Sequence, residues 1–228
     1  YIMEKITFCI PSKSNLQYLK HCIKSIRTNA YRLDHDIIIY VDEDTDGTVD
    51  WLEKNNAALN IKYKINPDCN LKLRGIGPAY NECILSAETD VVMIFHADMI
   101  LGKDADYELY KHLTDSSVVC ATRIEPPLHP AGPEKIIRNF GMWPEEFNHS
   151  EFNLTVAELK LTHRGRITYG CFAPWMVKKN TIVSIGLHDP ILHSYHEDSD
   201  IFNRFILAGC SLIQSWESFV YHLTCRGG

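Results

Sequence analysis

The sequence predicts an α/β domain in which a mostly parallel sheet lies between two layers of helices. In the first 100 residues, short apolar segments typical of strands alternate with segments of helical periodicity. Two of these segments, residues 36–41 and 90–95, are continuous apolar runs, as expected of strands covered on both faces. Single helices between successive strands imply right-handed crossovers and therefore parallel strand pairs.

The first half contains the more regular elements. The strand at residues 5–10 is expected to stop at Pro11, and Leu16, Leu19 and Ile23 then follow helical spacing. The expected strands cover residues 5–10, 36–41, 61–65 and 90–95, and the expected helices cover residues 16–26, 49–54 and 78–87.

The second half is less regular. Its clearest element is a helix at residues 198–208, which places Ile201, Phe202 and Phe205 on one side and ends at Gly209. Further strands are expected at residues 118–124, 212–214 and 219–222, and further helices at 152–161 and 178–185. Because no repeat, low-complexity segment or linker interrupts the chain, we expect residues 1–228 to form a single domain.

The composition argues against several classes of protein. A formal net charge of -6 argues against non-specific nucleic-acid binding, which requires a basic surface. No apolar run approaches the roughly 18 residues of a membrane span, so no integral membrane segment is expected. The eight cysteines are scattered singly, which indicates reduced thiols and a cytoplasmic protein, with the cytoplasmic face of a membrane as an alternative location.

Polar or acidic loops follow three of the expected strands. They are Pro11-Ser12-Lys13, Asp42-Glu43-Asp44 and His96-Ala97-Asp98. Parallel strands end at the same sheet edge, where open α/β sheets bind their ligands. Crowded carboxylates repel one another and a diphosphate, so a divalent cation is the natural bridge between them. The first loop has no G-x-G-x-x-G or Walker pattern, which argues against a dinucleotide-binding Rossmann site.

Several segments, in this order, resemble glycosyltransferase family 2 and its inverting relatives. The segments are Ile10-Pro11-Ser12, residues 41–48, residues 77–81, His96-Ala97-Asp98 in the place of a D-x-D motif, residues 186–189, and Glu197-Asp198-Ser199-Asp200 with Arg204 and Gly209. The resemblance implies the GT-A fold, a Rossmann-like three-layer sandwich. It also implies transfer of a sugar, with inversion, from a nucleotide-diphosphate sugar to an acceptor that is a glycan, lipid or protein.

The resemblance assigns roles to individual residues. Asp42 or Asp44 would hold the nucleoside, Asp98 and His222 would bind Mn²⁺ or Mg²⁺, and Asp198 would be the general base. The nucleotide-sugar half, about residues 1–100, would use Pro11, Ser12, Asp42, Asp44, Arg74, Asn81, His96, Ala97 and Asp98. The acceptor half, about residues 101–228, would use Gly170, Cys171, Glu197 and Asp200, the last two also being competing candidates for the base.

Other interpretations of these residues stay open at the level of sequence. An aspartate directly after a strand is often a turn residue or a helix cap, and Glu197 and Asp198 favour a helix start in any protein. His96 replaces the first aspartate of the family motif, which makes a catalytically inactive nucleotide- or sugar-binding module the main alternative function. A nucleotidylyltransferase is disfavoured, because its Gly-rich phosphate loop is missing.

Overall fold

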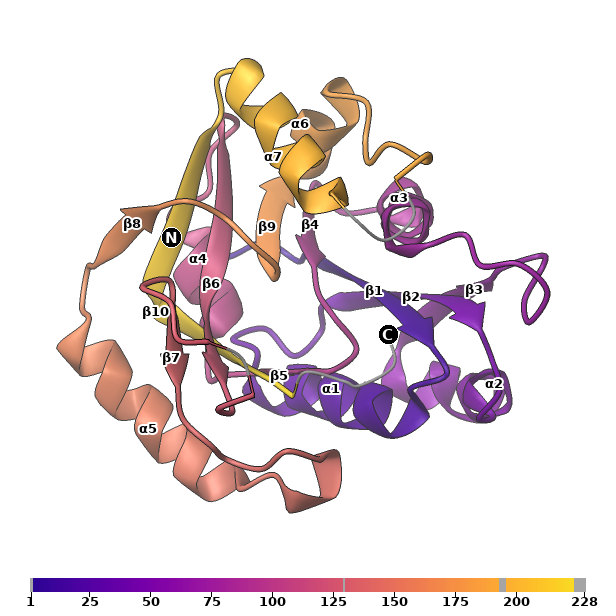
Figure 1. The fold of residues 1–228 in the computed structure, drawn as a ribbon, viewed down its shortest axis with the longest axis horizontal. Coiled ribbons are helices and arrows are strands. Elements are labelled where there is room, and N and C mark those ends of the chain that lie inside the picture. The colour runs from indigo at the N-terminus through magenta and orange to yellow at the C-terminus, as the bar shows by residue number, and fades with distance from the viewer. Residues whose placement is uncertain (1, 129, 193–195, 224–228) are drawn as a thin grey trace.

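One continuous sheet organises the protein (Figure 1). The computed structural model describes residues 2–128, 130–192 and 196–223. In these residues the strands follow the order β3-β2-β1-β4-β9-β6-β10-β5, with β7 beside β6 and β8 beside β10. The strands are β1 Thr7–Lys13, β2 Asp36–Glu43, β3 Ile61–Ile65, β4 Val91–Ile94, β5 Met99–Leu101, β6 Ser117–Glu125, β7 Lys135–Ile137, β8 Ile167–Tyr169, β9 Trp175–Lys178 and β10 Ser211–His222.

The strand directions place many strand ends at one edge. β1 is parallel to β2 and β4, β2 is parallel to β3, and β6 is parallel to β7 and β10. β9 is antiparallel to both of its neighbours, β4 and β6, so these two strands run in the same direction. The carboxyl ends of β1, β2, β4, β6 and β10 therefore lie at the same edge of the sheet, and the expectation of a mostly parallel sheet is confirmed.

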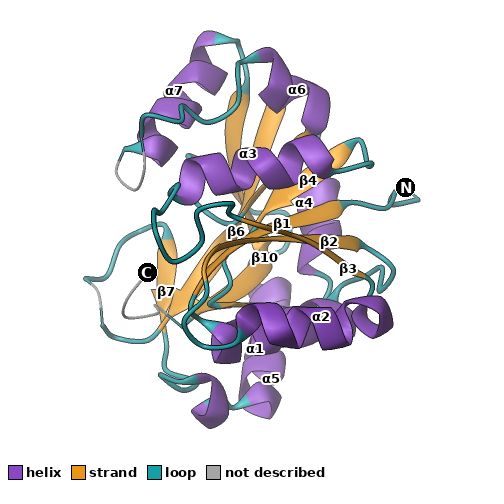
Figure 2. Ribbon diagram, turned by 90° about the vertical axis from the view of Figure 1, so that its right-hand side faces the viewer, coloured by secondary structure: helices purple, strands orange, loops and turns teal. Residues whose placement is uncertain are grey.

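Helices cover both faces of this sheet. Figure 2 shows α3, α6 and α7 on one side and α1, α2 and α5 on the other. The helices are α1 Leu16–Asn29, α2 Thr48–Leu59, α3 Ile76–Ser86, α4 Ala105–Tyr110, α5 His149–Thr162, α6 Lys179–Ser184 and α7 Glu197–Leu207, with a 3₁₀ helix at Pro144–Glu146. The apolar runs that predicted two-sided burial are indeed covered on both faces, since every residue of β4 is buried.

Two apolar clusters form the core. The larger one packs the central strands against the helices and includes Phe8, Phe95 and Trp175. The smaller one lies between α5 and the end of β10 and includes Phe152 and Tyr221. The buried Tyr221 hydroxyl donates to the carbonyl of Gly141 at 2.7 Å, so this second cluster fixes the end of β10.

Several expected boundaries are wrong, and pairing within the sheet accounts for three of them. β1 does not stop at Pro11 but continues to Lys13; beyond Cys9 it pairs only with β2, and proline is tolerated where a strand has one neighbour. The two strands expected near the chain end are one strand, β10, whose register against β6 shifts between Ser215 and Phe219. The helix expected from residue 178 begins at Lys179, because residue 178 ends β9.

Among the described residues, no helix is both long enough and apolar enough to cross a membrane.

Candidate active site

A pocket opens at the carboxyl ends of β1, β2 and β4, where the sequence predicts ligand binding. It encloses about 800 Å³, including open solvent at its mouth. Its wall is formed by Pro11, Ser12, Lys13, Asn15, Asp42, Leu73, Gly75, Ile76, Ala79, Tyr80, His96, Ala97 and Asp98. Six of the residues expected to bind a nucleotide-sugar therefore line the same pocket: Pro11, Ser12, Asp42, His96, Ala97 and Asp98.

Asp42 shapes this pocket by ordering the loop between β3 and α3. Its carboxylate accepts hydrogen bonds from the backbone N–H groups of Arg74 and Gly75 at 2.9 Å each, and from Asn66 Nδ2 at 2.9 Å. The same side chain lines the pocket and is only 6 % exposed. Asp42 thus holds the pocket wall in place, while the side chain of Arg74 is not part of the lining.

Asp44 has a different environment. Its Oδ1 accepts from the backbone N–H groups of Gly47 and Thr48, and its Oδ2 accepts from that of Val49, at 2.8–3.1 Å. These donors belong to the first turn of α2, so Asp44 satisfies N–H groups that the helix itself leaves unpaired. Of the two candidates for the nucleoside contact, the structure favours Asp42, and Asp44 matches the interpretation as a helix cap.

Asn81 also lies outside the pocket lining. Its Nδ2 donates to the carbonyl of His188 at 2.8 Å, and its Oδ1 accepts from the backbone N–H of His188 at 2.9 Å. This reciprocal pair ties α3 to the segment that leads into α7. Asn81 therefore connects the two halves of the protein.

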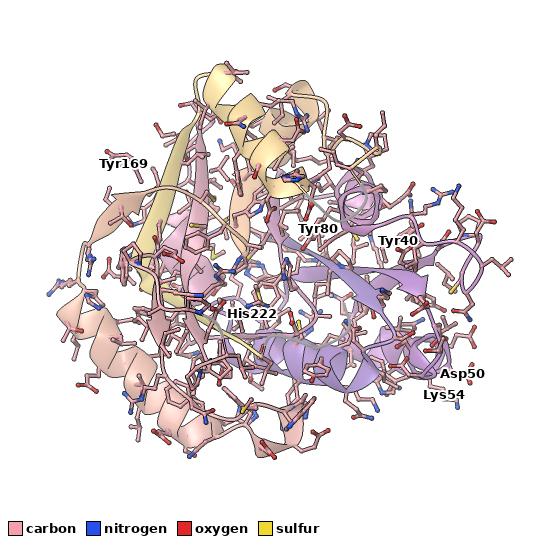
Figure 3. The ribbon with its side chains drawn as sticks, in the orientation of Figure 1. Tyr40, Asp50, Lys54, Tyr80, Tyr169 and His222 are labelled. Carbon is pink, nitrogen blue, oxygen red and sulfur yellow. The ribbon has the colours of Figure 1, made fainter. Side chains whose placement is uncertain are left out.

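Three potential metal ligands meet at the edge of the pocket. One ligand atom each from His96, Asp98 and His222 lies within 4.8 Å of the other two. His222 Nε2 lies 3.3 Å from Asp98 Oδ2, and the rings of His96 and His222 are 5.9 Å apart. His96 and Asp98 follow β4, whereas His222 ends β10, so strand order rather than sequence proximity forms this cluster. In Figure 3, His222 and Tyr80 both lie in the central part of the molecule, and the ring of Tyr80 is 6.4 Å from that of His96.

Glu125 supports this cluster and was missed at the level of sequence. It ends β6, is 2 % exposed, and contacts His222 Nδ1 at 2.9 Å and Lys135 Nζ at 2.8 Å. The contact leaves Nε2 of His222 facing Asp98, as in sites where a second carboxylate orients a metal-binding imidazole. The signal was present, because Glu125 directly follows the expected strand at residues 118–124.

The acidity of these groups follows from their neighbours. Burial opposes ionisation of Glu125, but His222, Lys135 and Arg123 outweigh it and lower the Glu125 pKa to about 2. Burial would lower the pKa of His222, but the carboxylates of Asp98 and Glu125 raise it to about 9. Burial lowers the pKa of His96 to about 4, so this imidazole is neutral and has a lone pair available at pH 7.

Asp198 lies in the first turn of α7. Burial, and secondarily the charge of Glu197, raises the pKa of Asp198 to about 6. Its charge acts on Tyr80, which lines the pocket, and on Cys171, which is expected on the acceptor side. A carboxylate with a pKa of about 6 is deprotonated at neutral pH yet is a better proton acceptor than an ordinary aspartate.

Asp200 is occupied by a structural contact. It accepts from Arg204 Nε at 2.9 Å, and Arg204 Nη1 also donates to the carbonyl of Ile185 at 2.8 Å. This network joins α7 to the turn after α6. Of the two neighbouring acids, Glu197 has a buried Oε2 without a hydrogen-bond partner among the described residues, whereas Asp200 is paired.

Other polar atoms between α3, β9 and the segment before α7 also lack partners. The Tyr80 hydroxyl, Trp175 Nε1 and His188 Nε2 are buried and form no hydrogen bond within the described residues. The ring of His188 lies 5.5 Å from that of Tyr80 and 6.1 Å from that of Trp175, so the three side chains are contiguous. Unpaired buried polar atoms are costly, so these three groups lower the stability of the folded protein unless another polar group satisfies them.

Gly170 and Cys171, expected on the acceptor side, follow β8. Gly170 has φ +128°, a value that L side chains rarely adopt, and its carbonyl contacts Cys120 Sγ at 3.7 Å. Cys171 is partly buried, and burial raises the pKa of its thiol well above the ordinary value; the charge of Asp198 adds to this shift.

The chain is similar to one known protein family in sequence and to a solved glycosyltransferase structure in fold. The sequence matches the profile of a family described as glycosyl transferase family 2 over residues 7–174. Among curated protein sequences, none matches the chain. Among solved structures, the crystal structure of GalNAc-T7 with UDP, GalNAc and Mn²⁺ has a similar fold, with a TM-score of 0.72 at 12 % sequence identity. The match covers 96 % of this chain but 43 % of that one, and it establishes the GT-A fold.

Proposed function

This chain belongs to glycosyltransferase family 2, and from that membership we propose that it transfers a sugar, with inversion, from a nucleoside-diphosphate sugar to a hydroxyl or amine of an acceptor. The observation that carries the proposal is the convergence of His96, Asp98 and His222 at the edge of a pocket on the carboxyl edge of the sheet. GalNAc-T7, whose crystal structure contains UDP and Mn²⁺, has the same fold.

The residues of this cluster fit a divalent cation. Two imidazoles and one carboxylate within 4.8 Å supply a mixed nitrogen and oxygen donor set. Such a set suits Mn²⁺, and Mg²⁺ is the second candidate, although it prefers oxygen ligands and bound water. The replacement of the first motif aspartate by His96 is compatible with this role. A bound cation would supply Lewis-acid stabilisation of the departing diphosphate.

We assign the donor to the first half of the chain. Its nucleoside would lie in the pocket against Asp42, Pro11 and Ser12, with the diphosphate directed toward Asp98. Arg74 contributes through its backbone N–H to Asp42, and Asn81 contributes by holding α3 against the second half.

We assign the general base to Asp198. As the acceptor oxygen or nitrogen forms its bond to the anomeric carbon, the bond from that carbon to the diphosphate breaks, and the acceptor proton passes to the Asp198 carboxylate. The raised pKa of about 6 supports this role. Asp200 is engaged by Arg204, which supports the choice of Asp198 over Asp200.

We also propose a reducing compartment for this protein. The seven cysteines that the structure describes are free thiols, which supports a reducing compartment such as the cytoplasm.

A binding experiment tests the proposal. We expect UDP to stabilise the protein in the presence of Mn²⁺ but not in EDTA, by about 2.7 kcal/mol when UDP is at about 100 times its dissociation constant. Asp98→Asn should abolish the metal-dependent part. Asp44→Asn is the matched control, because it removes the same charge from a carboxylate that contacts α2. Equal stabilisation with Mn²⁺ and with EDTA would contradict the metal-dependent mechanism.

A further inference from the structure

The side chain of Arg123 has no role yet assigned in the fold or in donor binding. It lies near the carboxyl end of β6, two residues before Glu125 and so on the same face of the strand. Its side chain is 21 % exposed, yet it forms no hydrogen bond with any residue that the structure describes. A guanidinium carries five N–H donors, so nearly all of its hydrogen-bonding capacity is unused.

Arg123 contributes to the charge balance of Glu125, but this contribution leaves most of its N–H donors unused. Arg123 Nε lies 3.5 Å from Glu125 Oε1, which is too long for a strong hydrogen bond. The same carboxylate already contacts His222 Nδ1 through Oε1 at 2.9 Å and Lys135 Nζ through Oε2 at 2.8 Å. Glu125 is therefore satisfied without Arg123, and the guanidinium remains available to another anion.

The ring of Phe172 packs against one face of the Arg123 guanidinium. The Arg123 Cζ lies 4.6 Å from the centre of the Phe172 ring, a stacking distance that holds the planar group in one orientation. Phe172 directly follows Gly170 and Cys171, the two residues expected on the acceptor side. A stacked arginine whose N–H edge is unused suits two-point recognition of a phosphate or a carboxylate.

The position of Arg123 points to the acceptor rather than the donor. Arg123 is not part of the lining of the donor pocket. It lies 3.5 Å from Glu125, which contacts the metal-cluster residue His222, and it is close enough to Asp198 to act on it electrostatically. Asp98, Glu125, Glu197 and Asp198 would together repel an anionic acceptor unless a cation faced it.

We propose that Arg123 binds a phosphate or carboxylate group of the acceptor, and that the acceptor is therefore an anionic molecule. The inference rests on the proposed function, because it takes the side of Asp198 as the acceptor side. It adds the chemical class of the acceptor, which the family and the fold leave open.

Ligand-observed NMR with phenyl phosphate, and with benzyl alcohol as its neutral match, tests this inference. The protein is first saturated with UDP and Mg²⁺, so that the donor side is filled. We expect phenyl phosphate to bind more tightly than benzyl alcohol, and Arg123→Gln to weaken its binding about 10- to 100-fold. Arg123→Lys keeps the positive charge but loses the planar guanidinium, so its affinity for phenyl phosphate should lie between those of the parent and of Arg123→Gln. It also provides a second variant if Arg123→Gln folds poorly.

Arg138→Gln is the matched control. Arg138 also stacks on a phenylalanine, with Cζ 5.2 Å from the ring centre of Phe140, but it is paired with Glu151. We expect this variant to bind phenyl phosphate like the parent. Calorimetry with UDP and Mn²⁺ should give the same UDP affinity for all the arginine variants.

Two results would overturn the inference. Phenyl phosphate binding that is unchanged in Arg123→Gln would leave the arginine with a structural role. A loss of UDP affinity in Arg123→Gln, or competition between UDP and phenyl phosphate, would assign the guanidinium to the donor diphosphate. Failure of the proposed function gives a different result: the parent would bind no UDP with metal, while the phenyl phosphate titration repeated without UDP would still measure the contribution of Arg123.

Discussion

Replacing Asp198 by asparagine should raise stability and lower activity at the same time. The pKa of Asp198 rises in the folded protein from 3.8 to about 6, chiefly because the carboxylate is buried. The folded state therefore binds a proton more tightly than the unfolded state does between about pH 4 and pH 6. It follows that the contribution of Asp198 to stability falls as pH rises through this window and stays low above it.

The size of the effect follows from the same values. A difference of one pH unit corresponds to about 1.4 kcal/mol, so the ionised Asp198 destabilises the folded protein at pH 7 by about 3 kcal/mol at most, and solvent screening reduces this to about 1–3 kcal/mol. Asparagine has nearly the same shape and no charge. We therefore expect Asp198→Asn to unfold at a higher temperature at pH 7, by about 2–10 °C, and like the parent below pH 4.

Urea or thermal unfolding from pH 3.5 to pH 8, without metal or nucleotide, measures this difference. Asp200→Asn is the control, since it breaks the ion pair with Arg204 and should destabilise the protein at pH 7. Turnover of Asp198→Asn should fall about 10²–10⁴-fold while UDP affinity with Mn²⁺ stays unchanged. A stability gain that does not depend on pH, or no gain at all, would refute the reasoning.

Three further predictions concern neighbouring parts of the structure. Glu125→Gln should weaken Mn²⁺ binding in calorimetry about 10- to 100-fold, because the metal-binding imidazole loses its orienting carboxylate; unchanged affinity would contradict this role. Asp44→Ala should cost about 1 kcal/mol of stability in urea unfolding and leave UDP binding intact, whereas Asp42→Ala should weaken UDP binding; equal UDP affinities would count against the distinction. His35→Ala should destabilise the protein by about 2–4 kcal/mol in urea unfolding, because it removes the buried hydrogen-bond partner of both Asp106 Oδ2 and the backbone N–H of Ile6; a loss below about 1 kcal/mol would disagree.

Local sequence was sufficient wherever an element depends on its own residues. The expected strand at residues 61–65 has the bounds of β3, and the continuous apolar runs at 36–41 and 90–95 became β2 and β4. Continuous apolar runs are favourable only where both faces of a strand are buried, so they could be assigned to central strands from the sequence alone. By contrast, the short strands β5 and β8 were not expected, because they exist only as partners of β10.

The chemistry available to the site can be read from the sequence: polar and acidic loops follow the strands, in an order that resembles a glycosyltransferase family. The sequence did not determine which carboxylates meet. Asp42 and Asp44 are two residues apart, yet one faces the pocket and the other caps α2. Glu125 reaches His222 across 97 residues only because β6 and β10 are parallel neighbours. Distances across a sheet depend on strand order and register, which are set by the packing of the whole chain, and so only the tertiary structure could assemble the metal cluster and place Arg123 beside it.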